Sequence, residues 1–573
     1  MPTYDEATRA AVHRVIADRR EVLGGLRPDP VPDEVVTRVL AAAHDAPTVG
    51  PAQPWDFIVI RSQPTRERVR ELILDQREQP VGALPAPWGV TDLAPDAGEI
   101  VETPLNIAVT SDPTRGAPRG GDLRAHQRSA VYSTCLAVEN LWLAARAEGL
   151  GIAWVGVDNA VALARALALP EHVDLVAYLC LGYIAPAVPD PEPQLAPRRP
   201  LGWVVHHETY GQRSLPGEEP TSVLDETRRA IRPPDLAAAA AAQDRLEMMA
   251  GEGGTLGTLE DLCIQLAGLA GHCPPPVPEP AAVAVFAADH GVHGRGVSLS
   301  PQEATADRVR TCLTDRSFVN AVAAQVRAEV CVVDVGILSD IDGRSGLLPR
   351  KVRRATADMT VEPAMTVVEA RRAAEVGIEV ARDLVSTGCR CLLTGSLGVA
   401  DSVATAALIA AFTGADPADV VGSGARADDM TRARVIEAAR QALERHQPDP
   451  AAPFEALAAV GGLEHAALVG LLLSAAALHV PVVLDSGSAA AAALVAAAAE
   501  PDAVYAWVAG QRSGERGQAI ALRRLSLQPL VDVGLRLGEG TGAALALPIL
   551  QGAVRAMREV ATIGYERVAH QHS

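Results

Sequence analysis

Short apolar runs, each ending at a glycine or an acidic residue, recur through the second half of the chain. A helical stretch follows each run, and the runs cover residues 281–288, 330–333, 391–394, 482–484 and 504–509. A strand, a break and a helix repeated five times is typical of a parallel sheet with crossover helices, an α/β fold. Ligands bind such sheets at the carboxyl ends of the strands, so we expect the functional site where the five breaks fall.

The first part of the chain follows another pattern, in which helices outweigh strands. Periodicity predicts helices at 33–46 and 131–148, and strands or apolar runs at 57–61, 105–111, 152–157 and 175–184. This mixture is typical of an α+β fold. A stretch rich in charge, proline and glycine at 210–235 separates the two patterns, so we place a boundary near Pro216 and predict domains at 1–215 and 216–573.

Composition narrows the classes of partner and compartment. The formal net charge of −19 over 573 residues argues against nucleic acid or an anionic membrane as a general partner. No run approaches the roughly 20 strongly apolar residues that cross a membrane, and the amino terminus lacks the apolar core of a signal peptide. The eight cysteines are scattered without a CxxC pair, which favours reduced thiols and a cytoplasmic location.

Basic residues restrict the chemistry further. Lys351 is the only lysine, so a Walker A phosphate loop is excluded and Schiff-base chemistry is improbable. Arginines and backbone amides must bind any phosphate. His290 and His293 have a spacing seen in metal sites, but the pattern offers no third ligand, and we predict no metal.

One carboxylate is a candidate general base. The segment 535–548, LRLGEGTGAALALP, sets Glu539 between glycines, where a turn leads from a buried strand or short helix into an apolar helix. Glycine neighbours let a ligand approach closely, and a low local dielectric raises a carboxyl pKa toward that of a general base. Glycines around an acid also mark ordinary exposed turns, so the assignment of Glu539 as a base depends on the motifs that precede it.

The first part carries paired arginines, the run APTVGPAQPW at 46–55, a long helix at 132–149 and a second arginine pair at 198–199. In this order they resemble the nitroreductase-like flavoproteins, most closely the 5,6-dimethylbenzimidazole synthases. The resemblance implies a homodimeric α+β flavin fold that fragments reduced FMN with oxygen. It also implies roles for individual residues: Arg19, Arg20 and Arg198 at the phosphate, Pro47, Thr48, Val49, Gly50 and Gln53 along the flavin, and Glu21 as a catalytic carboxylate.

Two departures from that family leave the activity of the first part open. The family's aspartate after the two arginines is Glu21 here, whose extra methylene displaces the carboxylate by roughly an angstrom. The family's serine after TrpVal is Gly156, which has no hydroxyl, and the lid region 77–99 is short. A plain FMN-dependent reductase is therefore the alternative to benzimidazole synthesis.

The second part carries seven motifs in order, from GTLGTLEDL at 254–262 through ADHGV, VDVG, TGSLG, VLD and GQRS to LGEGTG at 537–542. They resemble nicotinate-nucleotide:dimethylbenzimidazole phosphoribosyltransferase over about 224–561. The resemblance implies that Glu539 accepts the azole proton during transfer from nicotinate mononucleotide to dimethylbenzimidazole. It also implies that further residues bind the substrates: Asp289, His290, Gly291, Gly395, Ser396, Gly398, Gly422, Gly424 and Gly538.

This part also departs from its family. Ser396 replaces an expected acid, AspSerVal at 401–403 replaces AsnThrThr, and Gln511 replaces a histidine. The leading hypothesis is a bifunctional enzyme of cobalamin lower-ligand assembly, homodimeric, whose small-molecule partners are nicotinate mononucleotide, dimethylbenzimidazole, reduced flavin and oxygen. The alternatives are a transferase fused to a plain reductase, and a flavin- or benzimidazole-binding module with eroded catalytic sites.

Overall fold

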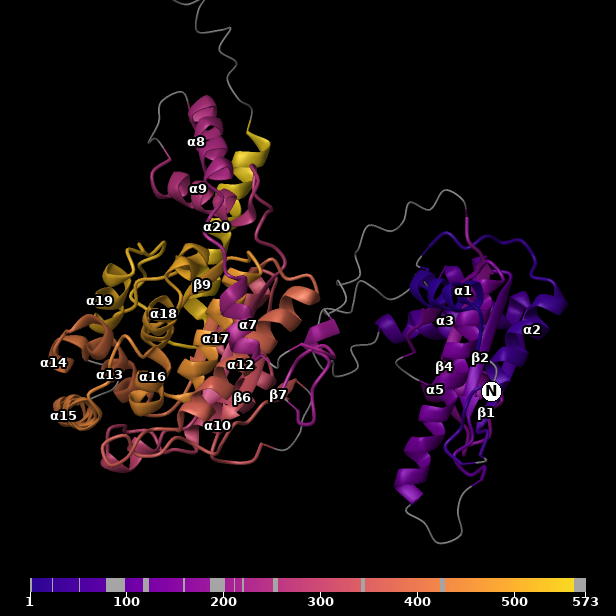
Figure 1. Ribbon diagram of the computed structural model, residues 1–573, viewed down its shortest axis with the longest axis horizontal. Coiled ribbons are helices and arrows are strands. Elements are labelled where there is room, and N and C mark those ends of the chain that lie inside the picture. Colours follow the sequence, from indigo (N-terminus) through magenta and orange to yellow (C-terminus); the bar gives the residue numbers. More distant parts are fainter. Residues whose placement is uncertain are drawn as a thin grey trace, which may run out of the picture. The chain divides into compact units, whose positions relative to one another are not determined.

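The computed structural model describes residues 3–22, 24–50, 52–78, 98–116, 123–157, 160–185, 201–210, 212–218, 221–250, 256–341, 346–422 and 428–560. The described residues up to 185 form one compact unit, and those from 201 onward form a second (Figure 1). Each unit is described by itself.

The division falls earlier than the boundary that we placed near Pro216. The indole N–H of Trp203 donates to Glu226 at 2.6 Å, and the Arg382 guanidinium lies 3.7 Å from the centre of the Trp203 ring. Arg213 pairs with Glu379 at 2.5 Å. Composition identified a linker-like stretch here, but these contacts anchor it to the second unit.

The first unit is an α+β fold built on a four-stranded antiparallel sheet of order β1-β2-β4-β3. Its elements in chain order are α1 (Glu6–Asp18), α2 (Asp33–His44), β1 (Trp55–Ile60), α3 (Gln63–Glu78), α4 (Glu99–Glu102), β2 (Leu105–Ser111), α5 (Leu123–Ala147), β3 (Leu150–Val155), α6 (Ala160–Ala166) and β4 (Asp174–Tyr183).

Both faces of this sheet are covered, which explains why its strands are apolar on both sides. One hydrophobic cluster joins one face to α2 and α5, and another joins the opposite face to α3, α4 and α6. The first helix differs from the others, because α1 has no buried residue and leaves Val12 and Ile16 about half exposed.

The second unit is α/β, with the elements η2 (Leu201–Trp203), α7 (Val223–Ala230), α8 (Leu236–Ala250), α9 (Thr258–Ala270), β5 (Ala281–Ala288), η3 (Gly291–Arg295), α10 (Ala304–Leu313), α11 (Phe318–Gln325), β6 (Ala328–Gly336), β7 (Leu347–Pro349), α12 (Val367–Ser386), β8 (Cys391–Leu397), α13 (Asp401–Thr413), α14 (Pro417–Val420), α15 (Asp429–His446), α16 (Pro453–Val460), α17 (Leu463–Ala477), β9 (Val482–Leu484), α18 (Gly487–Ala499), η4 (Pro501–Ala506), β10 (Trp507–Ala509), α19 (Arg516–Arg524) and α20 (Thr541–Glu559).

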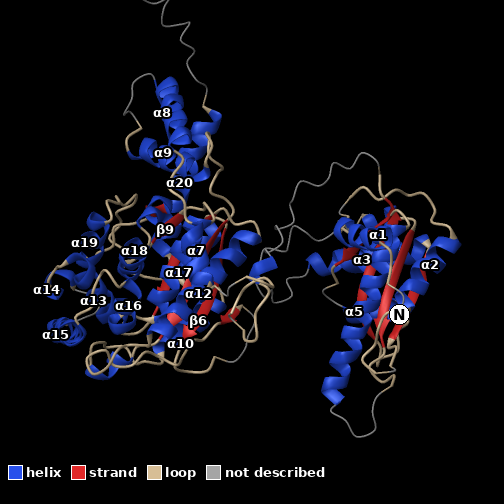
Figure 2. Ribbon diagram, viewed as in Figure 1, coloured by secondary structure: helices blue, strands red, loops and turns tan. Residues whose placement is uncertain are grey.

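Its sheet has six parallel strands in the order β10-β9-β8-β5-β6-β7. The chain adds β6 and β7 on one side of β5 and then returns to add β8, β9 and β10 on the other. The direction of winding therefore reverses between β5 and β8, and such a point opens a crevice at the carboxyl ends of the strands. Helix α17 packs against β5, β6 and β8, while α8 and α9 lie beside α20 (Figures 1 and 2).

Two glycines allow the tightest helix packing in this unit. A Cβ atom on Gly377 of α12 or on Gly470 of α17 would lie 1.8 Å from a carbonyl oxygen of the facing helix. Only glycine lets the two backbones approach so closely, and the contact seats α17 against the sheet.

The predicted fold classes of both parts are confirmed, and four of the predicted runs of the second part form strands. The fifth run, 504–509, is a strand only at Trp507–Ala509, because 504–506 belong to η4. The short edge strand β7 was missed, because three residues carry too little pattern. The segment before Glu539 was predicted wrongly as a buried strand or short helix; residues 535–540 are irregular and mostly half-buried. In the part of the chain that is described, no helix is long and apolar enough to cross a membrane.

Candidate active site

The loop that carries Glu539 closes over the carboxyl end of β8. The backbone N–H of Ser396 donates to the carbonyl oxygen of Gly538 at 2.8 Å. A Cβ atom on Gly395 would lie 2.6 Å from the carbonyl oxygen of Glu539, so this approach requires glycine. The structure thus brings together the predicted residues Gly395, Ser396, Gly538 and Glu539 beside the crevice.

A buried aspartate holds this loop in place. Asp485 follows β9, and its carboxylate accepts hydrogen bonds from the backbone N–H groups of Gly540, Gly542 and Ala543 at 3.0, 2.7 and 3.0 Å. These groups form the N-terminus of α20, whose dipole favours a negative charge. Gly540 has φ +101°, a conformation open mainly to glycine. The loop geometry therefore follows from Asp485 and Gly540 together.

The Glu539 side chain is half-buried and faces α10. Burial raises the pKa of Glu539 above its ordinary value, and the nearby Arg308 guanidinium opposes that rise. The negative charge of Glu539 in turn contributes to a raised pKa of Cys312 on the same helix, after burial itself. A glutamate with a raised pKa is a stronger base than a free one, as proton abstraction requires.

Asp289 and His290 lie at the carboxyl end of β5, where the sequence placed them, but both are fully buried. The Asp289 carboxylate accepts from the backbone N–H of Leu338 at 2.8 Å. A Cβ atom on Gly291 would meet the carbonyl oxygen of Thr356 at 2.5 Å. These residues therefore connect neighbouring strand ends rather than face the cavity described below.

A buried network continues inward from His290. Its Nε2 lies 2.9 Å from an Oε1 atom of Glu464, which lies 2.6 Å from Nδ1 of His465. Burial acts to lower the pKa of His290, but the surrounding carboxylates outweigh it and hold that pKa above the usual range. The two histidines likewise outweigh burial and lower the pKa of Glu464. His290 and Glu464 therefore each shift the pKa of the other toward its charged form.

The network reaches the surface of a cavity. His465 Nε2 lies 3.0 Å from the Thr405 hydroxyl, which lies 3.1 Å from that of Ser488. Ser488 donates to the Asp401 carboxylate at 3.2 Å. Gly398 packs between the two ends of this side-chain network. A Cβ atom on Gly398 would lie 3.3 Å from His290 Nε2 and 3.5 Å from the Asp401 Cβ.

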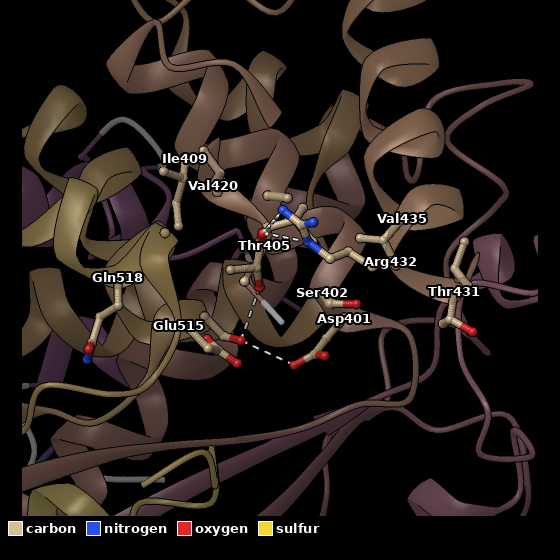
Figure 3. A pocket seen from close by; sticks show the side chains of 16 residues that line it. Asp401, Ser402, Thr405, Ile409, Val420, Thr431, Arg432, Val435, Glu515 and Gln518 are labelled. Atoms are coloured by element: carbon tan, nitrogen blue, oxygen red, sulfur yellow. Dashed lines mark hydrogen bonds between the residues drawn. The ribbon is translucent and has the colours of Figure 1, made fainter. Parts of the chain in front are cut away.

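The cavity, of about 130 Å³, lies among α13, α15, α18 and α19 (Figure 3). Asp401, Ser402, Glu515 and Gly422 line it, and Figure 3 shows the Asp401 and Glu515 side chains directed toward the same space. Gly422, one of the predicted substrate-binding glycines, lines this cavity, while Gly424 lies outside the described residues.

Close contacts link this cavity to the Glu539 loop. A Cβ atom on Gly422 would lie 3.5 Å from Glu515 Cα, and one on Gly487 would lie 2.4 Å from Glu515 Oε2. Gly538 adjoins both Ser486, just before Gly487, and Ser396. Four of the predicted substrate residues, Gly395, Ser396, Gly422 and Gly538, thus lie around one region at the carboxyl edge.

In the first unit, the arginine pair lies beside α5. Arg19 pairs with Glu139 at 3.2 Å and stacks over Trp142 at 5.2 Å, while Arg20 is exposed and forms no ion pair with a described residue. The Glu21 carboxylate accepts from the backbone N–H of Trp154 at 3.2 Å. Burial raises the pKa of Glu21, and this hydrogen bond opposes the rise. Glu21 therefore lies close to the TrpValGly motif.

The predicted flavin-lining segment at 47–53 contacts α5 at a different point from Arg19. The backbone N–H of Val49 donates to Ser133 at 3.1 Å, and the Thr48 hydroxyl bonds to the Gly50 carbonyl. Pro47, Gly50 and Gln53 are exposed. Ser133 and Glu139 are six residues apart, so the two segments contact α5 roughly 9 Å from one another.

These residues fit a phosphorylated flavin in part. Arg20 is an uncommitted cation for a phosphate, and the exposed segment at 47–50 can border a planar ring. Arg198 and most of the lid region 77–99 lie outside the described residues. Among those described, no group of three or more His, Cys, Asp or Glu residues is arranged to hold a metal.

Three residues of the site were missed from the sequence. Glu515 lies two residues after the quoted GlyGlnArgSer motif, and its position before a helix was the available signal. Glu464 and His465 lie in an apolar helical run, where a charged pair among leucines and alanines is itself a signal of a buried network.

The family models match both parts of the chain. A model described as Phosphoribosyltransferase matches residues 231–567, and one described as Nitroreductase family matches 16–183. The chain therefore belongs to the phosphoribosyltransferase family, and it carries a nitroreductase-family domain ahead of the transferase domain.

Its relatives are more specific. The nicotinate-nucleotide–dimethylbenzimidazole phosphoribosyltransferase of Salinispora tropica is 53% identical over 363 residues, which cover 61% of this chain and 100% of the relative. The same enzyme of a Roseiflexus species is 44% identical over 343 residues, 60% of this chain and 97% of that one. The crystal structure of the Thermus thermophilus enzyme superposes with a TM-score of 0.55 at 39% identity, over 57% of this chain and 97% of that chain.

Proposed function

We propose that the second domain transfers the phosphoribosyl group of nicotinate mononucleotide to 5,6-dimethylbenzimidazole. The observation that carries the proposal is the similarity to enzymes of that name along their whole length, 53% identical in the case of Salinispora tropica. Glu539 supports it, since a half-buried glutamate with a raised pKa lies in a loop held against β8.

The proposed step balances with Glu539 as the only base. An azole nitrogen attacks the anomeric carbon and forms a C–N bond, while the bond from that carbon to the pyridinium nitrogen breaks and its electron pair stays with nicotinate. The other azole nitrogen gives its proton to the Glu539 carboxylate. The leaving group departs without a proton, so no general acid is needed.

The direct test supplies the full chain with nicotinate mononucleotide and dimethylbenzimidazole and identifies products by mass spectrometry. We expect α-ribazole phosphate and nicotinate in equal amounts. Their absence, with the protein shown to be folded by circular dichroism, would contradict the transfer.

For the first domain we propose FMN binding, with benzimidazole synthesis as the leading function and FMN-dependent reduction as the second candidate. Arg20 and the exposed segment at 47–50 support flavin binding, and bound FMN would supply redox chemistry. The contact of Glu21 with the Trp154 backbone favours synthesis, because it keeps a carboxylate at the TrpValGly motif. Gly156 favours plain reduction, because the family's hydroxyl is missing.

A single substitution separates these two candidates. A Cβ atom on Gly156 meets nothing within 4 Å, so Gly156→Ser should fold without strain. We expect reduced FMN and oxygen to give more dimethylbenzimidazole with this variant than with the original chain, measured by mass spectrometry. Ala160→Ser, which introduces a hydroxyl at a nearby position, is the control and should not increase the yield of dimethylbenzimidazole. No product from either protein, alongside FMN-dependent oxidation of a nicotinamide donor, would favour the reductase.

We also propose that the first domain works as a homodimer. Helix α1 buries none of its residues, and Tyr132 and Leu136 of α5 are 63% and 45% exposed. An apolar surface of this kind suits a second copy of the chain. Light scattering of the full chain tests this, and a monomeric mass at micromolar concentration would contradict it.

A further inference from the structure

The cavity beside Asp401 is rich in hydrogen-bond acceptors and offers no uncommitted cation among its lining residues. Its one lining arginine, Arg432, already donates to the carbonyl oxygens of Ala418 and Val421 at 3.4 and 3.3 Å. The carboxylates of Asp401 and Glu515 face the same space (Figure 3). An anion entering here would meet two acidic side chains and no uncommitted cation among the lining residues.

The helix ends at the cavity do not change that balance. Asp401 is the first residue of α13, and the Glu515 carboxylate accepts from the backbone N–H of Gly487, the first residue of α18. The positive ends of both helices therefore already face carboxylates of the chain. A phosphate would have to displace them.

Both carboxylates keep room for further donors. Among the described residues, Ser488 donates to Asp401, and the Gly487 N–H donates to Glu515. An ionised carboxylate has about four lone-pair sites. The remaining sites on Asp401 and Glu515 are open to donors on a ligand in the cavity.

Resting on the proposed transfer reaction, we infer that Glu515, with Asp401 opposite it, binds the hydroxyl groups of the nucleotide ribose. The nucleotide offers four groups: a phosphate, a ring carboxylate, a pyridinium ring and the ribose diol. The first two are anions, the pyridinium nitrogen is cationic but carries no hydrogen, and the diol alone donates hydrogen bonds. Two carboxylates in one cavity therefore select the sugar and make Glu515 a determinant of specificity for ribose.

The electrostatics of the pair agree with this role. Partial desolvation, together with the charges of Asp401 and Asp485, raises the pKa of Glu515, and the Gly487 N–H and the Arg536 charge oppose that rise. Hydroxyl donors stabilise ionised carboxylates, so a bound diol should offset that repulsion. The chain's own departure from its family matters here, because Asp401 stands where the resemblance expects an asparagine.

The test combines a change in the protein with a change in the substrate. We expect the original chain to prefer nicotinate mononucleotide over its 2′-deoxy or 3′-deoxy analogue by about 10- to 150-fold in kcat/KM, as a hydrogen bond to a charged group predicts. Glu515→Gln should lose most of that preference, falling to about threefold or less, because amide and hydroxyl interact weakly. Glu444→Gln, exposed on α15, is the control and should keep the full preference.

A second variant and a second measurement separate the outcomes. Asp401→Asn keeps an acceptor for Ser488 and should fold; we expect a smaller loss of preference. Calorimetry measures the binding of both nucleotides and reports the same discrimination without turnover. If the protein discriminates in binding but transfers no phosphoribosyl group, the proposed function is wrong and the inference about Glu515 still holds. Equal weakening of the ribose and deoxyribose nucleotides by Glu515→Gln would overturn the inference.

Discussion

The two domains differ in how their candidate residues are brought together. In the transferase domain, motifs far apart in sequence converge on the carboxyl edge of one parallel sheet. Asp485, directly after β9, accepts hydrogen bonds from the loop that carries Glu539 and so connects the two. In the nitroreductase-family domain, the arginine pair and the segment at 47–50 contact separate points on α5. A parallel sheet gathers strand ends by its topology, whereas an antiparallel sheet does not.

The strongest test of the contrast removes the proposed base. Glu539→Gln keeps the shape but cannot accept the azole proton, so we expect kcat to fall about 10²- to 10⁴-fold while binding of nicotinate mononucleotide stays nearly unchanged. Glu559→Gln, exposed at the far end of α20, is the control. An unchanged kcat would remove Glu539 as the base.

Asp485 tests whether the convergence depends on one buried carboxylate. Asp485→Ala leaves the N–H groups of Gly540, Gly542 and Ala543 without their acceptor, so we expect the free energy of unfolding to fall by about 3 kcal/mol. Asp485→Asn retains one oxygen and should lose less. Urea denaturation measures both, and equal stability of the alanine variant would show that the loop needs no such anchor.

Acidity provides a third test, confined to the transferase. Glu539 must be ionised to accept a proton, and burial raises its pKa, so activity should already fall at a pH where an ordinary glutamate is still charged. Below that pKa the rate should drop about tenfold per pH unit. The measurement is kcat against pH. In Glu539→Gln this limb should vanish; its persistence would assign it to another group.

The smallest expected effect lies in the first domain. Arg20→Ala removes the uncommitted cation proposed for the flavin phosphate, so we expect FMN affinity to weaken about tenfold, as loss of one charged contact predicts. Fluorescence quenching of FMN measures it. Arg9→Ala, exposed on α1, should bind FMN normally, and phosphoribosyl transfer should be unaffected by either change.

The contrast also explains which features could be predicted from the sequence. Strand ends such as 288–289 and 484–485 were predictable, because an apolar run followed by an acid has one common meaning in an α/β chain. The Glu515–Asp401 cavity was not, since nothing local shows that α13 and α19 meet. The burial of His290 was not predicted either, because its partner Glu464 lies 174 residues later in the sequence.

The structure divides the chain earlier than the boundary predicted near Pro216, for a related reason. A stretch rich in proline, glycine and charge usually joins domains, but Trp203 stacks on Arg382 and Arg213 pairs with Glu379, both far along the chain. Composition reports the average tendency of a segment and not the contacts of single side chains. These contacts, together with the burial of Val223 and Leu224 in the core of the second unit, attach the segment to that unit.

The single lysine makes the transferase domain suited to site-directed labelling. Lys351 Nζ lies 3.1 Å from the Asp334 carboxylate and donates to the Ile337 carbonyl at 2.6 Å, just beyond the carboxyl end of β6. A reagent that acylates side-chain amines therefore has one target in the whole chain besides the terminal amine. A fluorophore or isotope tag placed there would report on the strand ends of the transferase domain alone, with no competing signal from side chains of the nitroreductase-family domain.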